Sequence, residues 1–256
     1  MARTLVPAQP AFDPQGYTKG AKPLLVALTG AGISAESGLK TFRDSGGLWE
    51  NHDVMTVASL EGWHRNPALV LEFYNQRRAQ AHTAQPNAGH LALVALEAVY
   101  DVVIVTQNVD NLHEKAGSRQ VVHLHGRLSE ARSLHPTGVV YEVGAEPIAL
   151  GDCCPKGGQL RPNIVWFGEE VPLIGPAAWL SALADVYLVV GTSLNVYPAA
   201  GLLDEAKHSA PKFLVDPHPP SWVSTPNLTV VSATAAEGLP ALATHLASPQ
   251  FLATLR

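Results

Sequence analysis

The feature that most constrains the fold is a short apolar run that leads directly into closely spaced glycines. Residues 24–28 are all apolar, and Gly30-Ala31-Gly32 follows after one threonine. A fully apolar run of this length is typical of a strand buried on both faces of a parallel sheet. Glycines after such a strand let the backbone turn tightly into a helix and approach a phosphate group. A tight turn without any ligand would explain the same residues.

Further strand-like and helix-like segments alternate along the chain. Strands are predicted at 102–106, 121–125, 163–167, 186–190, 212–215 and, at an edge, 230–231; helices are predicted at 67–81, 87–100, 179–185 and 239–247. This alternation favours an α/β fold with an open, mostly parallel sheet and helices on both faces. Residues 1–22 are expected to form a loose N-terminal arm. Turn residues dominate 127–162, which contains one short β-like piece at 139–143.

Composition excludes several classes of protein. The chain has 256 residues, of which 46% are hydrophobic, so it can build a core of normal size. A net charge of −5 without any long Lys/Arg run argues against nucleic-acid partners. The apolar runs are shorter than the ~20 residues of a membrane helix, and no signal peptide is visible. The adjacent Cys153 and Cys154 cannot make a disulfide framework. We therefore expect a cytoplasmic monomer with no membrane partner.

Three further groups of polar residues follow predicted strands. They are Gln107-Asn108-Val109-Asp110, His123-Leu124-His125-Gly126 and Gly191-Thr192-Ser193. Open α/β sheets bind ligands at the C-terminal ends of their strands. An amide and a carboxylate there can hydrogen-bond a carboxamide or ribose hydroxyls, and a histidine can act as a general base. Each group alone also has a structural explanation: a capped helix start, a satisfied histidine or an ordinary loop.

The glycine pattern does not complete the dinucleotide fingerprint of dehydrogenases. The third glycine is displaced, and the acidic residues in range, Glu50 and Asp53, lie in a polar stretch rather than after a strand. These departures argue against a hydride-transfer enzyme.

The motifs taken together, in their order, resemble the sirtuin family. The segments are GAGISAESGL, TFRDSGGLWE, TQNVDNLHEKAG, HLHG, LRPNIVWFGE and GTSLNVYPAA, and the resemblance covers about residues 22–245. It implies an NAD-dependent protein-lysine deacylase that acts on acylated proteins or peptides. It also implies a Rossmann-like NAD-binding domain (23–36, 86–126 and 163–256) and a small domain formed by two insertions (37–85 and 127–162), one helical and one β-rich.

The resemblance implies roles for individual residues. His125 would be the catalytic histidine, acting with Asn108 and Asp110, and His123 would support the structure. Residues implied to contact NAD, the co-substrate, are Gly30, Ala31, Gly32, Ile33, Ser34, Phe42, Arg43, Gln107, Asn108, Asp110, His125, Gly191, Thr192 and Ser193. Residues implied to hold the acyl-lysine peptide are Val165, Phe167 and Gly168.

One cofactor position departs from the family pattern. Asp216 stands where sirtuins usually have an asparagine that binds the adenine ribose, and a carboxylate can accept both ribose hydroxyls. A turn aspartate before Pro217 is the alternative explanation. We also expect Ala235 to lie near the adenine.

In the implied reaction, the acyl oxygen of the substrate attacks C1′ of the nicotinamide ribose and nicotinamide leaves. His125 then takes a proton from a ribose hydroxyl, and the products are free lysine, nicotinamide and O-acyl-ADP-ribose. The main alternative is a mono-ADP-ribosyltransferase that uses the same NAD site with another acceptor. A non-catalytic NAD sensor is a further alternative, against which the intact His125, Asn108 and Asp110 argue.

Tyr74 and Arg77 indicate the acyl group. Residues three apart on a helix share a face, so the phenol and the guanidinium could together bind a carboxylate. In an arbitrary helix, a solvated arginine beside a packed tyrosine would be the simpler explanation. Here the pair resembles the signature of sirtuins that remove succinyl and malonyl groups, and Ala58 matches the small residue that widens their acyl pocket. We therefore expect a desuccinylase and demalonylase that also accepts acetyl-lysine.

The zinc site of most sirtuins is largely missing. A structural zinc needs four ligands, mostly thiolates. Ser133 and Pro136 stand at the first cysteine pair, and Gly157 replaces one cysteine of the second, which leaves Cys154. We expect no bound metal, and expect short strands and an apolar cluster to hold 127–162 instead. The proposed cluster is Val139, Val140, Tyr141, Val143, Ile148 and Leu150.

Overall fold

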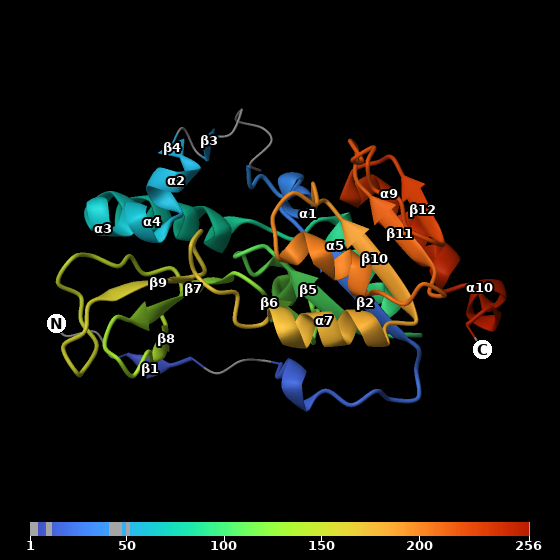
Figure 1. The fold of residues 1–256 in the computed structure, drawn as a ribbon, viewed down its shortest axis with the longest axis horizontal. Helices are drawn as coiled ribbons and strands as arrows, with labels where there is room; N and C mark the ends of the chain where they lie inside the picture. Colours follow the sequence, from blue (N-terminus) through green and yellow to red (C-terminus); the bar gives the residue numbers. More distant parts are fainter. Residues whose placement is uncertain (1–4, 9–11, 41–47, 50–51, 256) are drawn as a thin grey trace.

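A computed structural model describes residues 5–8, 12–40, 48–49 and 52–255. A six-stranded parallel sheet with helices on both faces forms the larger part, and a four-stranded antiparallel sheet lies beside a helical layer at one end (Figure 1). The predicted α/β class with a second, smaller part is confirmed.

The large sheet changes direction at its centre. Its strands are β2 (Leu24–Thr29), β5 (Asp101–Thr106), β6 (Val121–His123), β10 (Val186–Val190), β11 (Lys212–Val215) and β12 (Leu228–Val231). They run in the order β12-β11-β10-β2-β5-β6. The chain builds outward from β2 through β5 and β6, then returns to the other side of β2 with β10. The C-terminal ends of β2 and β10 therefore flank the switch point at which open α/β sheets bind ligands.

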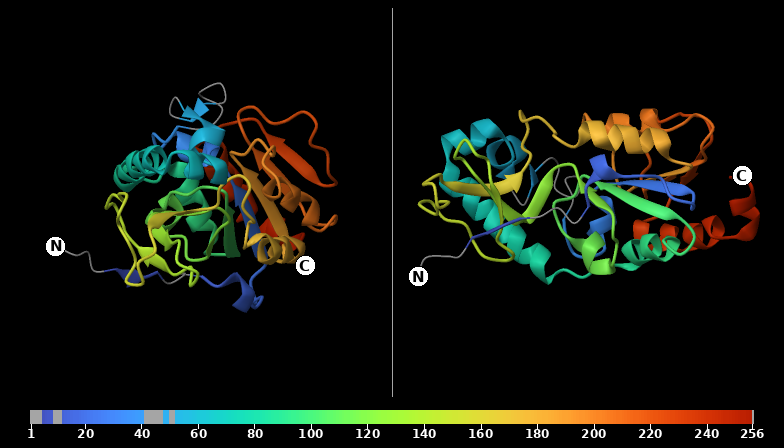
Figure 2. Two further views of the ribbon diagram at one scale, coloured as in Figure 1. Left: turned by 60° about the vertical axis from the view of Figure 1, so that its left-hand side comes forward. Right: turned by 90° about the horizontal axis from the view of Figure 1, so that it is seen from below.

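Alternate residues of the central strand β2 pack into two apolar cores, one on each face of the sheet. Leu25 and Ala27 pack with α5 (Ala88–Leu96) and α9 (Ala235–Leu246), and α10 (Pro249–Ala253) adds Phe251 to that side. Leu24, Val26 and Leu28 face α7 (Ile174–Leu183) and α8 (Leu202–Glu205). Figure 2 shows the two helical layers on opposite faces of the sheet. Burial on both faces explains why β2 is apolar at nearly every position.

The smaller part combines helices and a separate sheet. The helices are α2 (Val54–Val57), α3 (Leu60–Arg65) and α4 (Pro67–Thr83). The sheet is antiparallel, in the order β1 (Val6–Pro7), β8 (Val140–Glu142), β7 (Gly126–Ser133) and β9 (Leu160–Ile164). Helices and sheet share one apolar core, in which Tyr74 and Trp166 are nearly inaccessible to solvent.

Helix α4 has clear start and stop signals. Asn66 accepts a hydrogen bond from the Leu69 amide, and Pro67 occupies the first helical position. At the other end, the Lys115 ammonium donates to the carbonyls of Ala81, His82 and Ala84. Lys115 lies on α6 (Leu112–Ala116), which directly follows the predicted Asn108/Asp110 site. This lysine therefore ties the helical layer to the large sheet.

The N-terminal arm is packed rather than loose where it is described. Val6 and Pro7 pair with β8 of the small sheet. The side chain of Tyr17 is buried beside Trp179 of α7 and donates to Asp101 at the start of β5. The segment around η1 (Pro14–Gly16) therefore belongs to the large part, whereas β1 belongs to the small one.

Three local predictions from the sequence were wrong. The segment 127–162 contains the eight-residue strand β7, which was not predicted. Strand β6 ends at His123, so His125 lies in the turn before β7 rather than on the strand. In the predicted cluster, Tyr141, Val143 and Ile148 are buried, but Leu150 is 55% exposed because it lies in a surface turn.

The largest helices do not have the character of membrane segments. Among the described residues, no helix combines the length and hydropathy needed to cross a bilayer.

Candidate active site

The glycine loop after β2 packs directly against the loop after β10. The Gly32 amide donates to the Gly191 carbonyl at 2.8 Å. A Cβ atom on Gly30 would lie 2.7 Å from Cβ of Thr192, and one on Gly32 would lie 2.7 Å from Cα of Gly191. Gly191 itself has φ +60° and leaves no room for a side chain beside the Ile33 amide. The two loops predicted to contact NAD are thus joined at the switch point.

A buried polar network lies beneath these loops. The side-chain amide nitrogen of Asn108 donates to the Gly30 carbonyl and to Oγ of Ser34, both at 3.1 Å. Ser34 in turn donates to Oδ2 of Asp110 at 3.1 Å. The predicted residues from two neighbouring strands, β2 and β5, therefore meet in one hydrogen-bonded chain.

The carboxyl group of Asp110 is buried within this network. Burial raises its pKa above the usual range, while hydrogen bonds from the Leu112 amide and from Ser34 oppose that rise. An aspartate accepting two hydrogen bonds at fixed positions is suited to orient an amide or hydroxyl donor of a ligand.

His125 is prepared to act as a base. Its Nδ1 lies 3.0 Å from the Gln107 carbonyl, which can only accept, so Nδ1 carries the proton and Nε2 carries the lone pair. Burial lowers the pKa of His125 below its ordinary value, and the bond to Gln107 opposes this only in part. The imidazole is therefore neutral at physiological pH and can accept a proton at Nε2.

His123 contacts both the backbone of the segment that carries Asn108 and the side chain of Glu114. Its Nδ1 lies 3.2 Å from the Asn108 carbonyl, and its Nε2 lies 2.6 Å from Oε1 of Glu114 on α6. Burial alone would raise the pKa of Glu114, but the contact with His123 brings it below the usual range. His123 and Glu114 thus fix the backbone that carries Asn108 and Asp110. Glu114 could not be predicted as part of the site from local sequence patterns.

Backbone hydrogen bonds bring the predicted substrate residues next to His125. The Val165 amide donates to the His125 carbonyl at 2.9 Å. The Phe167 amide donates to the Ala58 carbonyl at 2.9 Å, and Ser59 pairs with Phe167 as a parallel bridge. Phe167 is 42% exposed, and Gly168 follows with φ +89°. This extended segment joins the helical layer to His125.

The proposed acyl-selecting residues lie in the core behind that segment. The Tyr74 side chain is completely buried, and its hydroxyl accepts a hydrogen bond from Nε1 of Trp166 at 3.0 Å. Arg77, one turn further along α4, is 7% exposed. Ala58 is 6% exposed and belongs to the same apolar cluster as Tyr74. Trp166 was not singled out from the sequence, although it lies between two residues that were.

The remaining predicted cofactor residues lie at separate places in the chain. Gln107 donates to Oγ1 of Thr192 at 3.1 Å, which links β5 to the loop containing Ser193. Asp216 is buried at the end of β11 and accepts from the His218 amide. Ala235 is buried at the start of α9, against Gly89. Phe42 and Arg43 lie outside the described residues.

The positions that correspond to zinc ligands form a different contact. Oγ of Ser133 donates to Sγ of Cys154 at 3.1 Å, and the backbone amide of Cys154 donates to Gly158. In the described parts of the chain, no three His, Cys, Asp or Glu side chains gather as a metal site would require.

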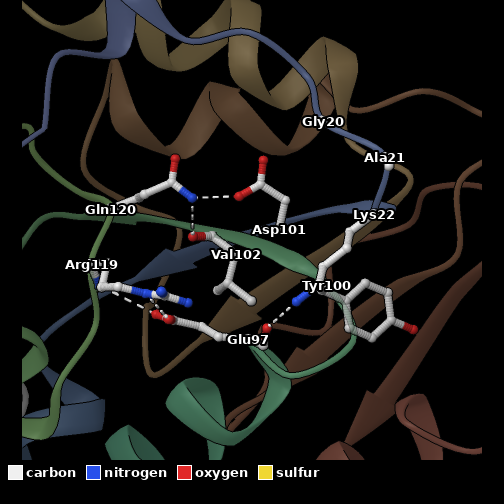
Figure 3. Close-up of a pocket in the computed structure, with 9 residues that line it drawn as sticks. All are labelled: Gly20, Ala21, Lys22, Glu97, Tyr100, Asp101, Val102, Arg119 and Gln120. Atoms are coloured by element: carbon white, nitrogen blue, oxygen red, sulfur yellow. Dashed lines mark hydrogen bonds and ion pairs between the residues drawn. The ribbon is translucent and has the colours of Figure 1, made fainter.

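A cavity of about 180 Å³ lies elsewhere, at the N-terminal end of the strands (Figure 3). Its polar groups pair with one another: Arg119 with Glu97, Gln120 with Asp101, and Lys22 with the Glu97 carbonyl. The cavity therefore lies at the opposite end of the strands from the glycine loop, and none of the predicted site residues line it.

Comparison with known proteins identifies the family. Residues 30–198 match the Sir2 family. The chain belongs to the Sir2, or sirtuin, family. The match begins at the first motif and ends within the last, GTSLNVYPAA, and the two late positions Asp216 and Ala235 lie beyond it.

Individual sirtuins are similar over most of their length. An NAD-dependent protein deacylase of Helicobacter pylori is 54% identical over 193 residues, which are 75% of this chain and 82% of the relative. One from Bacteroides thetaiotaomicron is 48% identical over 84% of this chain and 94% of its own. Among solved structures, a complex of a Sir2 homologue with NAD is 36% identical, with a TM-score of 0.79 and 92% of each chain covered.

Proposed function

We propose that this sirtuin is an NAD-dependent protein-lysine deacylase. The observation that carries the proposal is the tautomer of His125: a neutral base with Nε2 available, beside the Ser34–Asn108–Asp110 network at the switch point of the sheet. Its relatives at about half identity bear the name NAD-dependent protein deacylase.

The residues at the switch point fit NAD. The glycines leave no Cβ atoms between the two loops, so the backbone at the start of α1 (Gly32–Ala35) can approach a pyrophosphate. Asn108 and Asp110 offer amide and carboxylate groups at the neighbouring strand end, where a nicotinamide ribose would lie. When bound, NAD supplies an electrophilic ribose carbon whose leaving group is nicotinamide.

The protein then positions groups and moves one proton. The segment Val165–Gly168 holds the acyl-lysine beside His125, since Val165 is bonded to the His125 backbone. Nε2 of His125 takes a proton from a ribose hydroxyl, and the Gln107 carbonyl stabilises the resulting imidazolium through Nδ1–H. Asp110, Asn108 and Ser34 keep the ribose side of the site in one arrangement. The deprotonated hydroxyl attacks the acyl carbon, and one water molecule is consumed as the bond from that carbon to the lysine nitrogen breaks, so the products are free lysine, nicotinamide and O-acyl-ADP-ribose.

We further propose that dicarboxylic acyl groups, succinyl and malonyl, are good substrates and that acetyl is also accepted. Tyr74 and Arg77 place a phenol and a guanidinium on one face of α4, both largely removed from water. Burial raises the pKa of Tyr74 well above its usual range, so the phenol remains a neutral hydrogen-bond donor. A carboxylate between them would receive a charged and a neutral donor.

The substitution Arg77→Met tests this specificity. It removes the cationic partner of the acyl carboxylate, so kcat/KM on a succinyl-lysine peptide should fall about 30-fold, the equivalent of ~2 kcal/mol. Deacetylation should fall much less. Peptide mass and nicotinamide release are followed together, with Gln76→Met, an exposed neighbour on α4, as the control. An unchanged desuccinylation rate would refute the proposal, and nicotinamide release without loss of peptide mass would favour ADP-ribosyl transfer or NAD hydrolysis.

We also propose that the small sheet is held without zinc. Ser133 and Cys154 contact each other directly, and Gly157 and Pro136 offer no ligand atoms in their side chains. Purified protein should contain no stoichiometric zinc, and a strong chelator should leave both the melting temperature and the deacylation rate unchanged. One zinc ion per chain by elemental analysis would contradict this.

A further inference from the structure

A bidentate ion pair between Arg161 and Glu169 lies next to Trp166. Arg161 on β9 binds Glu169 through Nη1 to Oε1 at 2.7 Å and Nη2 to Oε2 at 2.9 Å. Nη2 also donates to the Ile164 carbonyl at 2.7 Å. Arg161 is only 2% exposed, so the guanidinium is fixed in the plane that these acceptors define.

This ion pair holds Trp166 in two ways. The Trp166 amide donates to Oε2 of Glu169 at 2.9 Å, which fixes the backbone. The guanidinium carbon of Arg161 lies 3.5 Å from the centre of the Trp166 ring, a cation–π contact in a desolvated place. Trp63 packs on the ring from α3, with 5.5 Å between ring centres. The indole therefore has little freedom to rotate.

The fixed indole determines how Tyr74 can donate. An indole N–H donates and cannot accept, so the Tyr74 hydroxyl must use its oxygen toward Trp166. Its proton is then directed away from Trp166. Loss of the indole N–H would remove this restraint on the orientation of the hydroxyl. Trp166 thus orients the Tyr74 hydroxyl before the substrate binds, so binding does not carry the entropic cost of ordering it.

The charge balance of the ion pair matters as well. Burial alone would raise the pKa of Glu169, but the bonds from Arg161 and from the Trp166 amide bring it below its usual value, so the carboxylate stays ionised. The charge of Arg161 is therefore neutralised locally. Arg161 fixes Trp166 without competing with Arg77 for an acyl carboxylate.

We infer that Arg161 and Glu169 are positioning residues which, through Trp166, hold the Tyr74 hydroxyl as a donor to the carboxylate of the acyl group. This inference rests on the proposed preference for dicarboxylic acyl-lysine. It assigns part of the selectivity for acidic acyl groups to three side chains in addition to Tyr74 and Arg77, namely Arg161, Glu169 and Trp166, which we call the positioning relay.

The variant Trp166→Phe is the direct test, because it keeps an aromatic side chain beside Arg161 and removes the N–H together with the five-membered ring. The ratio of kcat/KM for succinyl-lysine to that for acetyl-lysine should fall roughly 3- to 10-fold, mostly through KM of the succinyl peptide. Glu169→Gln should lower the same ratio, since it breaks the bidentate pair. Trp179→Phe, a half-exposed tryptophan on α7 outside this cluster, is the matched control and should leave the ratio unchanged.

A spectroscopic measurement on the wild-type chain avoids dependence on folding of the variants. The five tryptophans give separate indole N–H signals in an NMR spectrum, and single Trp→Phe variants assign them. If the Trp166 variant does not fold, its signal is the one left after the other four are assigned. Without NAD no turnover occurs, so peptides can be added at saturation. The Trp166 N–H signal should shift more with succinyl-lysine than with acetyl-lysine peptide. Equal shifts would overturn the relay.

The outcomes separate the inference from the function beneath it. If wild-type protein does not process succinyl-lysine, or Arg77→Met leaves that activity intact, the proposed specificity fails. If Arg77→Met abolishes the preference while Trp166→Phe and Glu169→Gln preserve the wild-type ratio, only the positioning relay is wrong.

Discussion

At the scale of single residues, the chemistry of His125 is set by a backbone atom. The Gln107 carbonyl fixes which ring nitrogen carries the proton, and burial keeps the ring neutral. The sequence predicted His125 as the catalytic histidine by its position before Gly126, but it could not specify the tautomer, because the carbonyl comes from a different strand end.

The pH dependence of the reaction should reflect this environment. Since burial lowers the pKa of His125, the neutral base should persist to lower pH than for an ordinary histidine, and kcat/KM should fall only as the pH drops below the ordinary histidine range. Rates between pH 5 and 8 with a saturating second substrate provide the measurement. An acid limb with its midpoint above 6.5 would contradict a buried neutral base.

Glycine positions illustrate what sequence reasoning could and could not supply. Gly30 and Gly32 were interpreted as giving a phosphate close access to the backbone. The structure adds another requirement, because both glycines also let their loop touch Gly191. Contacts between segments 160 residues apart in sequence have no local signal, and only their three-dimensional meeting explains why all three positions are glycine.

At the scale of elements, long periodic helices and apolar strands were predictable, whereas the small sheet was not. Helix α4 was placed to within two residues at its C-terminal end because its cap, proline and apolar spacing agree. Strand β7 was missed because it is polar: Glu130 and Ser133 are buried through pairing with Arg127, Asn163 and Cys154 rather than through apolar contact. Partners so distant in sequence could not be anticipated.

Helix α4 is joined to the small sheet by two side chains that the sequence did not reveal. Asn75 exchanges two hydrogen bonds of 2.9 Å with the Ile148 backbone. Arg78, 2% exposed, donates to the Leu128 carbonyl at 2.6 Å and to Asn75 at 2.7 Å. These contacts supply the rigidity that the residues at the zinc positions do not.

Replacing Arg78 should therefore destabilise the smaller part. Arg78→Met leaves the buried Leu128 carbonyl without its donor, and we expect a loss of about 2–4 kcal/mol in the free energy of unfolding. Arg65→Met is the control, since Arg65 forms an exposed pair with Glu61 and should change stability by less than ~0.5 kcal/mol. Urea unfolding followed by fluorescence measures both; equal effects would refute the structural role of Arg78.

At the scale of the whole molecule, the large sheet brings the loops after β2, β5, β6 and β10 to one end of its strands. The alternating pattern predicted parallel strands, and parallel strands end on the same side. Their order was not readable from local patterns, yet it determines that the loops after β2 and β10 are neighbours. The combined resemblance of the motifs, rather than any one motif, supplied this information.

Global stability should depend on pH through two buried histidines. Burial lowers the pKa of His90 to about 4 and that of His113 to about 3, and their rings lie 5.0 Å apart near Glu114 and His123. The unfolded chain binds protons at these sites below pH 6.5 while the folded chain does not, so stability falls as pH falls. Each should cost about 2 kcal/mol by pH 5.

Urea midpoints measured from pH 7 to 5 test this expectation. Ordinary carboxylates remain mostly ionised in that interval, so the slope reports mainly on histidines. His90→Gln should flatten the dependence, and constant stability across the interval would show that the two rings do not titrate as described.

The packed N-terminal arm has a consequence for how the two parts of the protein are held. Residues 5–8 join the small sheet and residues 12–22 lie against the large one (Figure 1). One stretch of chain is therefore attached to both sheets by its own contacts. Proteolytic removal of this arm would leave His125 and the glycine loops in place and would remove one covalent restraint on movement of the two sheets relative to each other.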